Sequence, residues 1–269
     1  MTKTTGRENA LAKPVVHTQT HTENTSHALL LHIPHSSTYL PPHFYPIYLN
    51  PQQLPELTAA TADLYTDELF IYPAPRLVFP VSRLLCDVER FRDPDLESMS
   101  RLGMWVCYTH DMQGRPLARF DESHVQKVLT TYYDVHHARL TRLTQQLLTA
   151  SGQVLILDCH SFPPALPYYP PGPCPDICLG ADSYHTPAYL IETARSFLER
   201  RGYKIAVNHP FSGSLVPLAY YQKERRVRSL MLEVNRRSYC DEKNRKLPLF
   251  GQLQQDLQEL IKMLVLGEY

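Results

Sequence analysis

The stretch VLILDCHSFP, residues 154–163, decides the fold of this chain of 269 residues. Its first four residues form a continuous apolar run, which is typical of a strand that helices cover on both faces. Two ionisable side chains, Asp158 and His160, follow the run at once. Ligands bind beyond the carboxyl ends of strands in open α/β sheets, so the same stretch also predicts a functional site.

The sequence around this stretch alternates between short apolar runs and helical spacing. That alternation predicts an α/β protein whose central sheet is covered by helices on both faces. Residues 1–26 contain few apolar side chains, and we expect a mobile tail there, followed by a single domain at 27–269. We expect further strands at 28–33, 76–81, 103–108, 176–179, 204–207 and 229–234, and helices at 55–72, 121–150, 186–202 and 250–264.

Composition excludes several classes of protein. The 27 basic residues equal the 27 acidic ones, so the chain lacks the positive field of a nucleic-acid or anionic-membrane binder. The basic run RRVR at 225–228 is better explained as a solvated loop. The six cysteines are scattered, as expected for reduced thiols. With no leader pattern and no long apolar run, we expect a cytoplasmic protein with no membrane contact.

Three expected strand ends carry ionisable groups: IPHSS at 33–37, LDCHS at 157–161 and LEVNR at 232–236. A hydrolytic zinc site takes about three protein ligands and leaves one position for water, and His35 and His160 supply two imidazoles. Asp158 points to the same side of an extended segment as His160 and is placed to orient that imidazole. The alternative for each histidine is a surface or hydrogen-bonded core residue, since neither H-x-x-E nor H-E-x-x-H is present.

Glu233 lies at the end of the apolar run Leu230-Met231-Leu232. A carboxylate in such surroundings is costly unless it is paired or lines a cavity. The sequence leaves two interpretations open at this point. Glu233 either forms an ion pair with a nearby arginine such as Arg236, or it faces a functional site.

Seven segments stand out along the chain: IPHSSTYLP (33–41), DLYTDELF (63–70), VSRLLCDVERF (81–91), LILDCHSFP (155–163), PDICLGAD (175–182), NHPFSGS (208–214) and LMLEVNRRSYCDE (230–242). Taken together and in order, they resemble the N-formylglutamate amidohydrolase family over about residues 28–265. That family is similar in turn to zinc carboxypeptidases and aspartoacylases. The resemblance implies a mixed, largely parallel sheet of the phosphorylase/hydrolase-like type. It also implies hydrolysis of N-formyl-L-glutamate to glutamate and formate, often in histidine catabolism.

The resemblance implies roles for particular residues. His35, Asp63 and His160 are the expected ligands of Zn²⁺ or another divalent transition metal, with Asp67 as support or as the alternative third ligand. Glu233 is the expected general base, and Arg83 the expected clamp on a substrate carboxylate or carbonyl. Further substrate contacts are expected from Arg90, His137, Asn208 and Arg236.

The chain departs from the family pattern at Ser37, where glycine is common, and at Glu89, where asparagine is usual. These departures bear on specificity for glutamate more than on hydrolysis. The resulting hypothesis is a zinc-dependent amidohydrolase of a small acidic N-acyl amino acid. The alternatives are a related amidase that acts on a peptide or cell-wall fragment, and a non-catalytic binding protein with the same fold.

Overall fold

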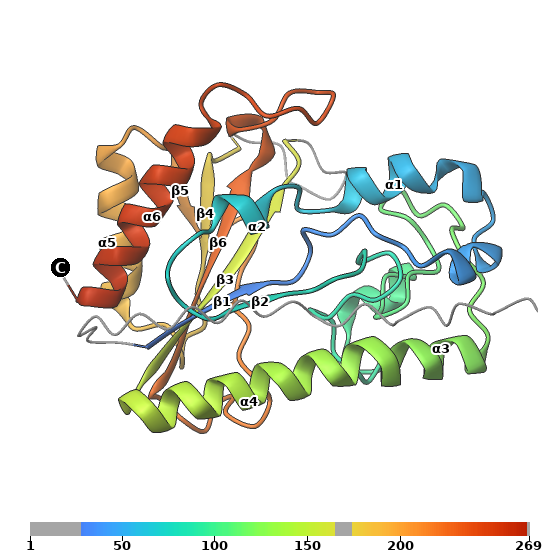
Figure 1. The fold of residues 1–269 in the computed structure, drawn as a ribbon, viewed down its shortest axis with the longest axis horizontal. Helices are drawn as coiled ribbons and strands as arrows, with labels where there is room; N and C mark the ends of the chain where they lie inside the picture. The colour runs from blue at the N-terminus through green and yellow to red at the C-terminus, as the bar shows by residue number, and fades with distance from the viewer. Residues whose placement is uncertain (1–27, 165–173, 268–269) are drawn as a thin grey trace, which may run out of the picture.

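The computed structural model describes residues 28–164 and 174–267, so the expected tail at 1–26 lies outside the described residues. Within them, six strands form one sheet in the order β2-β1-β3-β6-β4-β5 (Figure 1). Every neighbouring pair is parallel except β4 and β6, so the sheet is mixed and largely parallel, as predicted. The strands are β1 (Ala28–Ile33), β2 (Arg76–Val78), β3 (Val154–Phe162), β4 (Ile177–Gly180), β5 (Ile205–Val207) and β6 (Val227–Asn235).

The longest helical region follows the sequence signals closely. The Asp121 side chain accepts a hydrogen bond from the His124 backbone N–H, which caps the first helical turn. Gly152 ends the region with a φ of 73°, a conformation that glycine adopts without steric cost. A π-helical segment at Leu129–Tyr133 joins α3 to α4. The helices are α1 (Leu54–Thr61), α2 (Thr66–Leu69), α3 (Glu122–Val128), α4 (Asp134–Ser151), α5 (Ala188–Arg200) and α6 (Phe250–Leu266).

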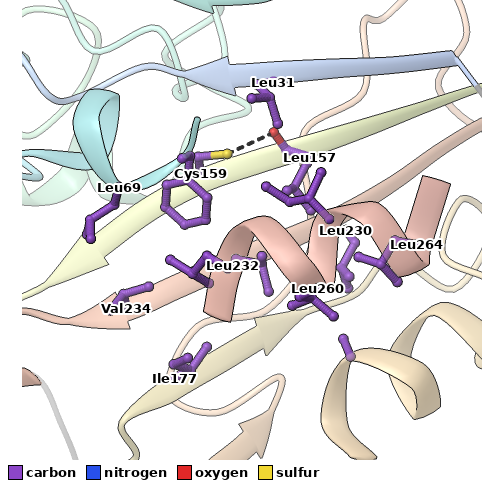
Figure 2. Close-up of a cluster of buried hydrophobic side chains, with 14 of the residues drawn as sticks. Leu31, Leu69, Leu157, Cys159, Ile177, Leu230, Leu232, Val234, Leu260 and Leu264 are labelled. Carbon is purple, nitrogen blue, oxygen red and sulfur yellow. Dashed lines mark hydrogen bonds between the residues drawn. The ribbon is translucent and has the colours of Figure 1, made fainter. Parts of the chain in front are cut away.

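Helices cover both faces of the sheet because alternate strand residues point to opposite sides. Leu155 and Leu157 of β3 belong to a core with α2, α5 and α6, and Figure 2 shows Leu157 and Leu230 near Leu260 of α6. The intervening residues Val154 and Ile156 pack instead with leucines of α4, which lies across the other face in Figure 1. Asp158 and His160 continue the series of residues that faces α4.

Two expected elements differ in the structure. The helix expected at 55–72 is broken after α1, because Ala62 is extended, with a ψ of 149°, and Tyr65, with a φ of 65°, precedes the separate helix α2. Asp63 therefore lies in a turn, and not on a helix face shared with Asp67. The strand expected at 103–108 is wrong, since only an isolated bridge joins Met104 and Tyr108.

The segment between β1 and α4 forms a second buried cluster with little regular secondary structure. This cluster includes Leu84, Leu85, Cys86 and Val88, so the chain around Asp87 is buried. All six cysteines are free thiols. In the described ranges no helix has the length and apolar content needed to cross a bilayer.

Candidate active site

His35, Asp63 and His160 converge at the carboxyl ends of β1 and β3. His160 Nδ1 lies 3.0 Å from Asp63 Oδ2, and His35 Nδ1 lies 3.7 Å from the same oxygen. The three residues are buried, and the ligand atoms they offer lie within 4.8 Å of one another. Two imidazole nitrogens and a carboxylate oxygen, brought this close, form a donor set that suits a zinc-type ion.

The backbone holds Asp63 against His35. The Asp63 N–H donates a hydrogen bond of 2.9 Å to the His35 carbonyl. The Thr66 hydroxyl donates to the Asp63 carbonyl, which fixes the turn between α1 and α2. The left-handed residue Tyr65 reverses the chain at this turn, so the break in the expected helix is what brings Asp63 to the end of β1.

His35 and His160 both direct Nδ1 toward Asp63. The other ring nitrogen of each, Nε2, is held by a carboxylate. His35 Nε2 lies 2.8 Å from Asp87 Oδ1, and His160 Nε2 lies 3.0 Å from Asp158 Oδ1. This is the support that metal-binding histidines ordinarily have, because it fixes the tautomer and the ring orientation. Asp158 thus has the contact that the sequence predicts for it.

The inward-facing atoms fit a cation. His35 Nδ1 is buried and has no hydrogen-bond partner among the described residues. Burial alone raises the pKa of Asp63, but the hydrogen bonds and charges of His160 and His35 outweigh burial and lower that pKa below its usual range. Asp63 therefore stays ionised. An ionised carboxylate beside an unpartnered imidazole nitrogen is an arrangement that a divalent ion would satisfy.

Glu233 stands directly beside His160, because the β3–β6 register pairs these two residues. The residue is only 7 % exposed, and its Oε2 is a buried atom for which the described chain offers no hydrogen-bond partner. Burial raises the pKa of Glu233 to about 8, although the charge of His160 opposes the shift. Such a carboxyl group is suited to accept and release a proton near neutral pH.

Arg236 does not form the ion pair with Glu233 that the sequence left open. Its guanidinium donates to the carbonyls of Ala59 and Ala60, at distances of 3.2 and 2.8 Å. These carbonyls lie near the C-terminal end of α1, where helices leave carbonyl groups without partners inside the helix. The structure therefore gives Arg236 a role in holding α1, and its contact with substrate stays a prediction.

Arg83 lies beside the candidate metal ligands. Its Nη2 and Nε atoms donate to Asp87 Oδ2 at 2.8 and 3.2 Å, and its Nη1 lies 3.8 Å from Asp63 Oδ1. The side chain remains 20 % exposed. Asp87 thus fixes both His35 and Arg83, so a guanidinium fork is held next to the three-residue group.

A cavity of about 310 Å³ adjoins the group, and Arg90, His137 and Asp158 are among its lining residues. His137 Nε2 lies 2.9 Å from the Val88 carbonyl and donates to it. Burial lowers the pKa of His137 to about 4, so this ring is neutral at physiological pH. Arg90 Nη2 donates to the Tyr108 hydroxyl. Two of the expected substrate contacts therefore line one cavity.

Two other expected residues lie elsewhere. Asp67 is not part of the group formed by His35, Asp63 and His160, and its charged neighbours are Glu68, Arg76 and Lys246. Asn208 is exposed, and its amide oxygen accepts a hydrogen bond from the Ala181 N–H. That bond ties the loop after β4 to the end of β5.

Sequence reasoning missed three buried polar residues at the site: His32, Asp87 and His136. Asp87 was detectable, because it stands in the apolar stretch from Leu84 to Val88, which is the argument that singled out Glu233. His32 likewise lies inside the apolar run of β1. Its position opposite Asp158 depends on the β1–β3 register, which a single sequence does not reveal.

Comparison with known proteins agrees with this geometry. The crystal structure of N-formylglutamate amidohydrolase from Ralstonia eutropha JMP134 superposes with a TM-score of 0.77 at 25 % identity, covering 90 % of this chain and 96 % of that one. A gene product of Agrobacterium tumefaciens gives a TM-score of 0.61 at 19 % identity, covering 88 % and 91 %, a likeness of fold. No curated protein matches the sequence.

The family comparison covers most of the chain. A model of the family described as N-formylglutamate amidohydrolase matches residues 27–240, from the start of β1 past the end of β6. The matched region includes all the residues that meet at the site. It supports an amidohydrolase that acts on a small substrate resembling N-formylglutamate. The chain therefore belongs to the N-formylglutamate amidohydrolase family.

Proposed function

We propose that this protein is a metal-dependent amidohydrolase that cleaves the amide bond of a small acidic N-formyl amino acid. The observation that carries the proposal is the convergence of His35, Asp63 and His160, with an unpartnered Nδ1 on His35 and the carboxyl group of Glu233 beside them. When bound by these residues, a divalent ion such as Zn²⁺ lowers the pKa of a water molecule toward about 7 and polarises the scissile carbonyl.

The residues of the chain supply the proton transfers. Glu233 accepts a proton from the attacking water as the new C–O bond forms, and then gives that proton to the amine nitrogen as the C–N bond breaks. Asp87 and Asp158 hold the outer nitrogens of His35 and His160, which keeps both Nδ1 atoms directed inward. Formate and the free amino acid are the products.

Arg83 is the proposed clamp on the substrate. Asp87 holds its guanidinium next to the ligand group, and a planar guanidinium binds a carboxylate through two parallel hydrogen bonds. Arg90 and His137, in the adjoining cavity, are proposed to contact the remainder of the substrate. The cavity volume of about 310 Å³ matches a small molecule better than a long peptide.

A substrate panel tests this proposal. Zinc-loaded protein is given the N-formyl and N-acetyl derivatives of glutamate, glutamine, leucine and lysine, together with peptides and cell-wall fragments, and released amine is measured. We expect the highest kcat/KM for an N-formyl acidic amino acid. In Arg83→Lys we expect kcat/KM for that substrate to fall about 10- to 100-fold, mainly through KM, because lysine lacks the fork.

The matched control is Arg195→Lys, which changes an arginine on α5 that is 51 % exposed, and we expect its kinetics to equal those of the unchanged protein. Faster cleavage of peptides or cell-wall fragments than of any N-formyl amino acid would contradict the proposed substrate. Absence of cleavage of every compound in the panel would instead favour a binding protein.

A further inference from the structure

A second group of possible metal ligands adjoins the first and consists of His32 on β1, Asp158 on β3 and Glu89. Asp158 contacts His160 of the first group. His32 Nδ1 lies 2.9 Å from Asp158 Oδ1 and 3.3 Å from Glu89 Oε1. The ligand atoms of the three residues all lie within 4.8 Å of one another. His32 and Asp158 are fully buried, and the side chain of Glu89 is 17 % exposed. This arrangement comes from the β1–β3 register, which places His32 opposite Asp158.

His32 is held as His35 and His160 are held. Its Nε2 lies 2.9 Å from His136 Nε2, so the outer nitrogen has a hydrogen-bond partner and Nδ1 faces the two carboxyl groups. In all three histidines, therefore, Nδ1 points at carboxylate oxygens and Nε2 is tied to a buried side chain. A partner on the outer nitrogen is the ordinary support of a metal-binding imidazole.

The Glu89 carboxyl group directs an oxygen toward His32 and His160 without forming a hydrogen bond to either. Glu89 Oε1 is buried and finds no hydrogen-bond partner in the part of the chain that the structure describes. A buried carboxyl oxygen without a hydrogen bond is unfavourable unless a cation satisfies it. A divalent ion would remove this penalty.

An ion can reach the group from solvent. Glu89 and Asp158 both line the cavity of about 310 Å³ that adjoins the candidate active site. Residues 212–215 also line the cavity, and the Leu215 N–H donates a hydrogen bond to Asp158 Oδ2. That bond leaves Asp158 Oδ1 directed toward His32 and His160.

We propose that His32, Glu89 and Asp158 bind a second divalent transition-metal ion, so that the protein holds two ions per chain. One imidazole nitrogen and two carboxylate oxygens suit Zn²⁺, Co²⁺ or Mn²⁺. Asp158 links the two centres, because its Oδ1 contacts both His32 and His160. This proposal goes beyond the proposed function, which needs only the ion held by His35, Asp63 and His160.

Zinc stoichiometry tests the second site. The full-length protein is stripped with a chelator and dialysed against Zn²⁺, and bound metal is measured by atomic emission. We expect two ions per chain for the unchanged protein and one for Glu89→Gln, which keeps the side-chain shape but removes the charge. Glu242→Gln, at an exposed residue, is the matched control and is expected to keep two. Glu89→Asn provides a second variant, and circular dichroism checks the folding of each.

The His35→Asn variant separates this proposal from the proposed function. We expect it to keep one ion, at the second site, and the double variant with Glu89→Gln to bind none. A single ion in the unchanged protein that His35→Asn removes would overturn the second site and leave the proposed function standing. A single ion that Glu89→Gln removes and His35→Asn keeps would support the second site and overturn the proposed function. Two ions retained in Glu89→Gln would also overturn the proposal.

Discussion

Replacing His160 with asparagine is expected to remove one bound metal ion per chain and to lower the rate of N-formyl amino acid hydrolysis at least 1,000-fold, about what a loss of ~4 kcal/mol of transition-state stabilisation produces. The reason is the position of His160, whose Nδ1 faces Asp63 and whose Nε2 is fixed by Asp158. Asparagine cannot bring a ligand atom to the same point while keeping the hydrogen bond to Asp158.

The measurement combines metal content with formate release under saturating substrate. His43→Asn is the control, because His43 is an exposed residue that belongs to neither group of possible metal ligands. We expect it to keep both the metal content and the rate of the unchanged protein. If His160→Asn retained full metal content and full activity, the assignment of His160 as a ligand would be wrong.

The second large effect is expected for Glu233→Gln. Glutamine keeps the size of the side chain but cannot take up a proton, so we expect kcat to fall by about 10² to 10⁴, the usual contribution of general acid–base catalysis. Metal content and KM are expected to change little, since Glu233 is not among the three convergent ligands. Single-turnover kinetics and metal analysis on the same preparation check both parts.

The control for Glu233→Gln is Glu192→Gln, at an exposed residue on α5. It removes the same charge outside the site and is expected to leave kcat unchanged. A kcat for Glu233→Gln within a factor of two of the unchanged protein would show that another group moves the proton. Loss of metal in that variant would instead assign Glu233 a direct role in metal binding.

Much of the fold was predictable from the spacing of apolar residues. The run at 154–157 and the helical periodicity after Asp121 identify β3 and the long helix α3–α4, together with the signals that start and end that helix. The break after α1 was not predictable, because Leu57, Ala60 and Leu64 keep a helical spacing into the turn. The helix ends where Ala62 is extended, and Tyr65 is left-handed before α2 begins, a conformation that non-glycine residues seldom adopt.

The positions of site residues at strand ends were predictable from the sequence. The positions that depend on the pairing register between strands were less so. His35 and His160 follow apolar runs, so their meeting at one edge of the sheet could be expected. Asp63 required the family resemblance, since a hydrogen bond to the His35 backbone places it there. The hydrogen bonds of Arg236 were not predictable, because the need of the α1 carbonyls for donors is not visible in the residues around it.

The polar residues that support the site depend on pairing between strands far apart in sequence. The sheet order places β1 next to β3 and β3 next to β6, which brings His32 opposite Asp158 and Glu233 opposite His160. A shift of one residue in either register would turn these side chains to the opposite face. A single sequence does not encode that choice in any local pattern.

Metal removal and reloading is the most direct test of the claim that hydrolysis depends on an ion held by His35, Asp63 and His160. Chelator-treated protein is assayed for formate release from N-formylglutamate, before and after addition of Zn²⁺, in parallel with His35→Asn. We expect activity to disappear on chelation and to return with Zn²⁺ in the unchanged protein only. Full activity in the metal-free protein, or equal recovery in His35→Asn, would contradict the account.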